Sequence, residues 1–255
     1  MKNWTQVPAG ELNAANQRLW VAIGDNAEEV TTRINTDPAF VTNIARLMVN
    51  GGYEPSTSQK ASREIMGTNF FGIEEAIKHF GVNPSKQQLA ALAEVPFSEE
   101  VLTSHKDTHI LVAVFSLSIL DIRGIARKQS DRTLFYSQDW YDKQAFAKDK
   151  GEVGWQLVRK VPVANSTSKN WNEQQALLDK TEETPKAQVM VYTIIGHFLN
   201  TGERLFEKIY VRCSDLDSGG NRVYVGDFDA KGLYVISWSD DVRTNVLGLS
   251  AARKQ

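Results

Sequence analysis

The amino-acid sequence predicts an α+β protein in which a helical N-terminal region, residues 1–105, precedes a mixed α/β domain, residues 106–255. Three observations predict this organisation. Apolar side chains recur at helical spacing in the first part of the chain. Near residue 108 the composition changes to an apolar run rich in β-branched residues, which is typical of a buried strand. From Ile209 onward, short β-type segments alternate with turns rich in glycine and aspartate.

The first helical stretch covers residues 12–50. Its apolar stripe begins with Leu12, Ala15, Leu19 and Ala22. The pair Asp37-Pro38 marks a new helix start, because proline is tolerated at the first helical position. Gly51-Gly52 then ends the stretch, and the polar residues 55–58 are expected to form a connection.

Residues 73–80 and 84–93 predict two short helices separated by a turn. This outline is that of a helix-turn-helix, with Lys86, Gln87 and Gln88 near the start of the second helix, where base-reading side chains would lie. A plain helical hairpin packed on a domain is the commoner structure behind such a pattern. Both interpretations stay open, so a nucleic-acid-associated regulatory role for residues 73–93 is the alternative function.

In the second half, helical and β-type segments alternate. Residues 109–120 predict a buried strand, followed by a charged connection at 123–132. A strand is expected at 155–163, a short helix at 171–178 and a longer buried helix at 185–199. The expected C-terminal strands cover residues 209–213, 222–225, 233–238 and 247–252.

Composition excludes several classes of protein. The formal net charge of -2 predicts no general attraction to nucleic acid or to anionic lipid. Cys213 is the only cysteine, which excludes an intramolecular disulfide and argues against a cysteine zinc site. The longest apolar runs are too short to span a bilayer, and the N-terminal residues lack the apolar core of a signal peptide. We therefore expect a cytoplasmic protein with no membrane partner.

No motif predicts a catalytic centre, a metal site or a cofactor. His105 and His109 are four residues apart, but the segment after His109 is strand-like, so isolated histidines explain them better than a zinc site. A nucleophile elbow and a phosphate-binding glycine loop are both absent. The C-terminal aspartates have no EF-hand spacing, and turn formation explains them better than calcium. Cys213 occupies an apolar, strand-like position where a thiol is inert. The sequence thus favours a protein that is not an enzyme.

The segment Val223–Arg253 resembles the closing part of C-type-lectin-like domains. Trp238 is followed by a polar run, then by Leu247-Gly248-Leu249 and a final Arg253. The resemblance is strongest to the formylglycine-generating-enzyme-like branch, which includes the bacterial variable proteins of diversity-generating retroelements. It implies a C-type-lectin-like fold for residues 106–255. A single cysteine does not support formylglycine chemistry, and the Glu-Pro-Asn loop of calcium-dependent lectins is missing.

In such variable proteins, adenine-targeted mutagenesis changes side chains on a fixed scaffold, and the favoured codons cannot yield Glu, Gln, Lys, Met or Trp. Residues 209–253 contain no Glu, Gln or Met, and Lys231 and Trp238 would have to be fixed positions. The resemblance implies a non-enzymatic protein that binds a protein or other macromolecular ligand. The expected ligand-binding residues are Asp227, Asp229, Tyr234, Ile236, Ser237, Trp238, Ser239, Asp241, Val242, Thr244 and Val246.

Overall fold

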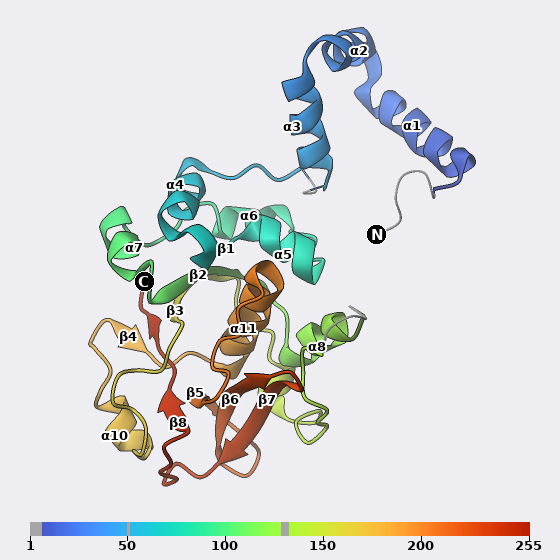
Figure 1. The fold of residues 1–255 in the computed structure, drawn as a ribbon. Coiled ribbons are helices and arrows are strands. Elements are labelled where there is room, and N and C mark those ends of the chain that lie inside the picture. Colours follow the sequence, from blue (N-terminus) through green and yellow to red (C-terminus); the bar gives the residue numbers. More distant parts are fainter. Residues whose placement is uncertain (1–6, 50–51, 129–132) are drawn as a thin grey trace. The chain divides into compact units, whose positions relative to one another are not determined.

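The α+β class expected from the sequence is confirmed in the computed structural model, which describes residues 7–49, 52–128 and 133–255 (Figure 1). A helical N-terminal part precedes two mixed β-sheets. Contacts divide the chain into two compact units, one up to Glu54 and one from Pro55. The first unit contains α1 (Ala9–Ile23), a short 3-10 turn η2 (Gly24–Asn26), α2 (Ala27–Thr36) and α3 (Pro38–Val49).

The second unit begins with helices that the sequence places in the N-terminal region. They are α4 (Thr57–Met66), α5 (Ile73–Phe80), α6 (Lys86–Ala91) and α7 (Glu99–His105). These helices share a core with the strands; the Trp155 indole N–H, for example, donates to the Leu92 carbonyl at 2.9 Å. The division by packing therefore falls at Glu54, earlier in the chain than the boundary expected at residue 105.

One sheet has the strand order β1-β2-β3-β9-β4. Its members are β1 (Phe70–Phe71, after the 3-10 turn Gly67–Asn69), β2 (His109–Val114), β3 (Gly154–Arg159), β4 (Glu182–Glu183) and β9 (Ala252–Arg253). Only the β1–β2 pair is parallel. Every residue of β2 is buried, which explains its continuous apolar sequence. The C-terminal strand β9 thus belongs to the first sheet, where it lies between β3 and β4.

The other sheet has the strand order β7-β6-β5-β8. It consists of β5 (Tyr210–Leu216), β6 (Arg222–Asp229), β7 (Gly232–Trp238) and β8 (Leu247–Leu249), with β5 and β8 parallel. Helix α11 (Ala187–Thr201) packs against strands of both sheets, and every residue from Ala187 to Phe198 except Val189 is buried. A helix that is apolar all round needs such a central place. One face of the second sheet is thereby buried, and the other carries the candidate site.

Three local predictions were wrong for identifiable reasons. The polar residues at 55–58 begin helix α4, because Ser56 is its N-cap and forms a capping box with Gln59. The apolar run from His109 ends as a strand at Val114. Helix α8 (Ile119–Lys128) starts inside the strand expected at 109–120 and continues into the expected charged connection. Ser118 and Asp121 bond each other at this start. The expected last strand, 247–252, is two strands, because its buried run crosses from one sheet to the other.

The remaining elements agree in type with the sequence. The buried helix expected at 185–199 is α11, which ends at a left-handed Gly202 as its sequence indicates. The short helix expected at 171–178 is α10 (Trp171–Gln175), and the four-residue α9 (Ala145–Lys148) precedes β3. Residues 129–132, in the expected charged connection, and Asn50 and Gly51, in the expected helix end, lie outside the described residues.

Candidate ligand-binding face

All the residues expected to bind a ligand have accessible side chains on β6, on β7 or in the loop after β7. Trp238, Asp241 and Val246 are exposed, and the others are half-buried. On β7 the side chains alternate, because successive strand residues point to opposite faces. Leu233 and Val235 are buried toward the core, whereas Tyr234 and Ile236 are half-buried on the outer face.

Cross-strand register brings residues from all four strands of this sheet to the outer face. Tyr224 on β6 lies opposite Ile236 on β7, and Tyr210 on β5 lies opposite Leu247 on β8. The covering loop, residues 239–246, lies next to these side chains. Together they line an apolar hollow of about 220 Å³. Its lining residues are Tyr210, Tyr224, Ile236, Trp238, Val242, Thr244, Val246 and Leu247.

The structure thus brings together part of the predicted set. Ile236, Trp238, Val242, Thr244 and Val246 all line the hollow. Tyr234 lies beside it, where its ring stacks on Tyr136 with a centroid distance of 4.0 Å and meets Tyr210 edge-on at 6.4 Å.

The other predicted residues make local hydrogen bonds. Asp227 accepts one from the Tyr210 hydroxyl at 3.1 Å, and Asp229 accepts one from the backbone N–H of Lys231. The Ser239 hydroxyl accepts one from the backbone N–H of Asp241 at 3.3 Å. Burial and the nearby Asp227 carboxylate raise the pKa of Tyr210, so this phenol stays protonated at neutral pH.

Ser237 differs from its neighbours, because it points to the other side of β7. Its hydroxyl donates to the Asp217 carboxylate at 2.6 Å. The same carboxylate accepts from the backbone N–H groups of Gly219 and Asn221 in the β5–β6 turn. Burial acts to raise the pKa of Asp217, but these hydrogen bonds outweigh it and the pKa is lowered. Ser237 therefore helps to hold a turn.

A buried arginine fixes the covering loop. Arg212, with 0% exposure, donates through Nη2 to the Asp240 and Val242 carbonyls at 3.3 and 2.6 Å. Through Nη1 it donates to the Lys169 carbonyl and the Gln174 side chain at 2.9 and 2.8 Å. Hydrogen bonds to carbonyl oxygens compensate for the loss of water around a buried charge. Arg212 thus ties the loop that bounds the hollow to the chain before and within α10.

A second arginine supports the same loop from nearer the surface. Arg222 donates to the Asp240 carboxylate through Nε and Nη2 at 3.1 and 3.0 Å. Its guanidinium also lies over the Trp171 ring, 3.9 Å from the centroid. The backbone N–H of Trp171 donates to the Asp240 carbonyl at 2.9 Å. Asp240 is therefore held through both its side chain and its backbone.

We call Arg212 and three glycines, Gly226, Gly232 and Gly248, the framework of this face. A Cβ at Gly226, where φ is +143°, would lie 2.2 Å from the Ile209 carbonyl oxygen. At Gly232, where φ is +106°, it would lie 2.3 Å from the Phe135 backbone. At Gly248 it would lie 2.6 Å from the Pro162 side chain. Gly248, part of the Leu-Gly-Leu motif, thus lies where a larger residue would not fit without a shift of Pro162.

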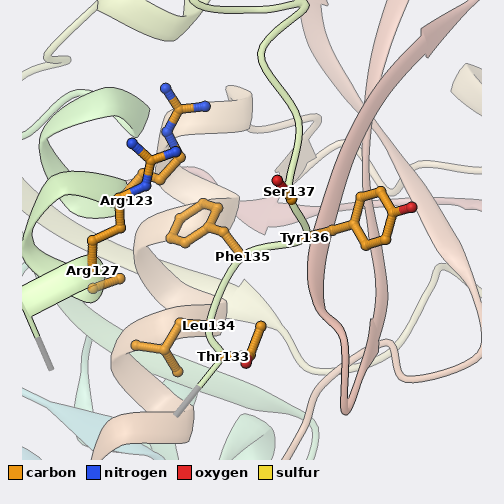
Figure 2. A pocket seen from close by; sticks show the side chains of 8 residues that line it. Arg123, Arg127, Thr133, Leu134, Phe135, Tyr136 and Ser137 are labelled. Carbon is orange, nitrogen blue, oxygen red and sulfur yellow. The ribbon is translucent and has the colours of Figure 1, made fainter. Parts of the chain in front are cut away.

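Tyr136 belongs to a segment that also lines a separate, smaller pocket. Figure 2 shows this pocket, of about 170 Å³, with Tyr136 pointing toward the β-strands, on the side away from Arg123 and Arg127. Arg123 is buried and already donates to the Gln138 carbonyl at 2.9 Å and to Asp142 at 2.5 Å. The segment therefore contributes to the candidate face through the Tyr136–Tyr234 stack.

The helix-turn-helix alternative has a short second helix. α6 has six residues, and the Gln88 side chain is engaged with Ser85 in a capping box. Lys86 and Gln87 are left with accessible side chains at its start. Base reading by this segment stays a prediction.

Other sequence expectations concern reactive groups and the membrane. Cys213 is fully buried, and burial raises the pKa of its thiol well above the usual value. His105 and His109 lie with ring centroids 4.6 Å apart, and within the described residues no group of three His, Cys, Asp or Glu side chains is arranged to hold a metal. Among the helices described, none is long and apolar enough to cross a bilayer.

A scan against protein-family models, a search of curated proteins and a search of solved structures each found no match. The sequence reasoning missed Tyr210, Tyr224 and Leu247 of the hollow, and Arg212 behind it. A charged residue inside an otherwise apolar strand, as at Arg212 between Val211 and Cys213, is the signal that would have found the framework.

Proposed function

We propose that this chain is a non-enzymatic binding protein whose C-terminal sheet presents a display surface to a protein ligand. The observation that carries the proposal is the apolar hollow on the outer face of the second sheet. Five of the predicted ligand-binding residues line it, namely Ile236, Trp238, Val242, Thr244 and Val246. The finer assignment, a C-type-lectin-like domain of the diversity-generating-retroelement type, is part of this proposal.

The chemistry of the hollow suits a protein ligand. Trp238 is 60% exposed and Val246 is 45% exposed, so a partner that covers them removes large apolar surfaces from water. Aromatic residues around a concave centre, surrounded by polar residues, are typical of the residues that dominate binding energy in protein interfaces. Asp241 and Arg243 on the covering loop supply an exposed polar rim.

The groups around the hollow are suited to contact more than to proton transfer. Its ionisable lining groups are the phenols of Tyr210 and Tyr224, and burial raises the pKa of both. General acid–base catalysis works best with a group whose pKa is near the working pH. Binding through rigid aromatic and small polar side chains needs no such group, as in antibody loops.

The separation between framework and contact residues supports diversification. Arg212, Gly226, Gly232 and Gly248 are fixed by close backbone approach or by buried hydrogen bonds. Ile236, Val242, Thr244 and Val246 have accessible side chains, and no side-chain hydrogen bond joins them to another part of the described chain. Side chains at such positions can change while the backbone stays in place.

A display experiment tests the proposal. In a library of the full chain on the yeast surface, Ile236, Val242, Thr244 and Val246 are replaced by mixtures of Tyr, Ser, Asn and Asp. Selection is made against one purified globular protein. A matched library carries the same mixtures at exposed positions outside the face: Lys143, Val161, Leu177 and Glu207.

We expect folded binders from the first library and none from the second. Equal enrichment from both libraries, or none from either, would contradict the proposal. Loss of folding across most of the first library would also contradict it, because a display surface has to tolerate substitution. The fraction of correctly folded clones is measured with a terminal epitope tag and by resistance to protease.

A further inference from the structure

A corner of three tyrosine rings lies beside the hollow, on the outer face of the second sheet. Tyr210 on β5 and Tyr234 on β7 both lie opposite Gly226 on β6, so the two residues are at the same level of the sheet. Their ring centroids are 6.4 Å apart and their planes are inclined by 79°. Tyr136, which points toward the β-strands (Figure 2), stacks on Tyr234 at 4.0 Å. We call these three tyrosines the tyrosine corner.

Two carboxylates adjoin the tyrosine corner. Asp227 accepts the hydrogen bond of the Tyr210 hydroxyl at 3.1 Å, and Asp229 follows two residues later at the end of β6. Burial raises the pKa values of Tyr210 and Tyr234, and the charges of both carboxylates raise them further. Both carboxylates therefore lie close to both phenols, and the two phenols stay protonated and uncharged at neutral pH.

The two carboxylates are not neutralised by a neighbouring basic side chain. Within the part of the chain that the structure describes, Asp227 and Asp229 form no ion pair, whereas Asp240 of the same face is paired with Arg222. Lys231, in the turn after Asp229, meets it through the backbone N–H and has an exposed side chain. The tyrosine corner is therefore bordered by negative charge that attracts a cation.

The rings and the carboxylates favour the same class of ligand group. The face of an aromatic ring is negative, so an ammonium or guanidinium ion within about 6 Å of the ring centre is attracted to it. Rings that meet at a large angle can contact one cation from two sides, as aromatic cages do with quaternary ammonium groups. An anion would meet both the ring faces and the carboxylates with like charge. The tyrosine corner therefore suits a cationic group.

We propose that the tyrosine corner is a subsite for a lysine or arginine side chain of the protein ligand. Tyr210 and Tyr234 contact the cation, and Asp227 and Asp229 compensate its charge. The inference rests on the proposed function, because Tyr210 also lines the hollow, which takes an apolar group of the same ligand. The ligand thus presents a basic residue next to an apolar one.

The subsite belongs to this particular sequence. Tyr234 is one of the positions expected to differ between variants of the protein, so another residue at this position removes the preference for a basic group. Lysine and arginine suit both parts of the face, since their apolar stem can lie along the hollow while the charged end reaches the tyrosine corner.

Two small probes of equal length test the subsite on the full chain. Butylammonium carries the charged end of a lysine side chain, and 1-butanol is its neutral counterpart. Binding is followed by fluorine NMR of protein labelled with 3-fluorotyrosine, with each signal assigned by a single replacement of tyrosine with phenylalanine. At constant ionic strength, we expect butylammonium to shift the Tyr210 and Tyr234 signals in a saturable way. Butanol is expected to bind there about tenfold more weakly or less.

Substitutions separate charge from ring contact. The double variant Asp227→Asn and Asp229→Asn is expected to weaken butylammonium binding about tenfold. Asparagine at 227 can still accept from Tyr210, and it tolerates the φ of +49° there as aspartate does. Tyr234→Leu is expected to weaken binding, followed at the Tyr210 signal, whereas Tyr234→Phe keeps the ring face and most of the affinity. Asp241→Asn, the same charge change on the covering loop, is the matched control and is expected to have little effect.

No saturable shift at Tyr210 and Tyr234 would overturn the subsite. So would equal affinity for butanol, or butylammonium binding that the double variant leaves unchanged or that Asp241→Asn weakens as strongly. The display selection measures binding through other residues, so the two failures can be told apart. Library binders without butylammonium binding would overturn the subsite alone, and butylammonium binding without library binders would contradict the display function and leave the cation site.

Discussion

At the scale of single residues, Arg212 determines the shape of the candidate face more than any residue on its surface. Its guanidinium holds two carbonyls of the covering loop and two acceptors before and within α10. Removing the donor takes the Arg212 hydrogen bonds from the Lys169 and Val242 carbonyls, whereas the Asp240 carbonyl keeps the bond from the Trp171 backbone N–H. A polar group that loses its partner away from water costs more than the hydrogen bond itself contributes.

We predict that Arg212→Met lowers the free energy of unfolding by about 3 kcal/mol, with a range of about 2 to 5. The measurement is urea denaturation followed by tryptophan fluorescence. Arg243→Met is the matched control, because the Arg243–Glu173 ion pair lies at the surface, and little change is expected. Equal effects of the two substitutions would show that Arg212 does not organise the loop.

Gly226 provides a second test at this scale. An alanine there needs both a backbone conformation that side chains disfavour and room beside the Ile209 carbonyl. We predict that Gly226→Ala lowers the thermal midpoint by several degrees, from a cost of about 1–3 kcal/mol in strain. Gly154→Ala is the control, since nothing lies within 4 Å of its Cβ and its φ is ordinary. A Gly226→Ala chain as stable as the control would remove this glycine from the framework.

At the scale of elements, the start of β2 holds a buried histidine close to basic residues of β3 and β9. His109 is buried there beside His105, Arg159 of β3 and Arg253 of β9. Glu182 lies 3.9 Å from the His109 ring but is already bonded to Arg159 at 2.6 Å. Burial, then the neighbouring positive groups, lower the pKa of His109 to about 3. The folded protein therefore favours the neutral form of the His109 imidazole.

A pH prediction follows from this shift. The unfolded chain binds a proton at His109 below about pH 6.5, whereas the folded chain does so only near pH 3. Stability that is present above pH 6.5 is therefore lost as the pH falls toward 3, by up to about 5 kcal/mol. His109→Gln should flatten the fall in the free energy of unfolding between pH 6.5 and 4. His105→Gln is the control; if it flattens the curve as strongly, His109 is not the cause.

The elements also show which parts of the fold the sequence could predict. Gly202, the 218–221 turn and the Asp229–Gly232 turn carry their own conformational signals, so the end of α11, the start of β6 and the bounds of β7 were predicted to within two residues, whereas β6 extends to Asp229, beyond the expected Val225. Ser56 was misread because a polar run suits either a loop or a helix start, and Ser118, which lies at the start of α8, was placed inside an expected strand. The double strand at 247–252 depends on which sheets its neighbours join, and no local pattern encodes that.

At the scale of the whole molecule, the chain combines a helical unit, in which no residue from Val7 to Met48 is buried, and a unit with two sheets around α11. Tyr234 and Ile236 lie on the outer face of β7 as predicted, because strand alternation is a local property, whereas Ser237 points to the other side and was wrongly included. The hollow could not be predicted from the sequence. Tyr210 and Tyr224 line it because of cross-strand register. Arg212 holds the loop that bounds it, and that loop folds over the sheet. The central claim is that this hollow carries exchangeable contacts on a fixed framework.

Deep sequencing of the coding region across a population of the source organism tests that claim most directly. We expect amino-acid variation to be concentrated at Tyr234, Ile236, Val242 and Thr244. Arg212, Gly226 and Gly232 are expected to be unchanged. The comparison set is the exposed residues Lys143, Val161 and Leu177 of the same unit. Variation at the face that is no greater than in this set would contradict the claim that the hollow carries exchangeable contacts.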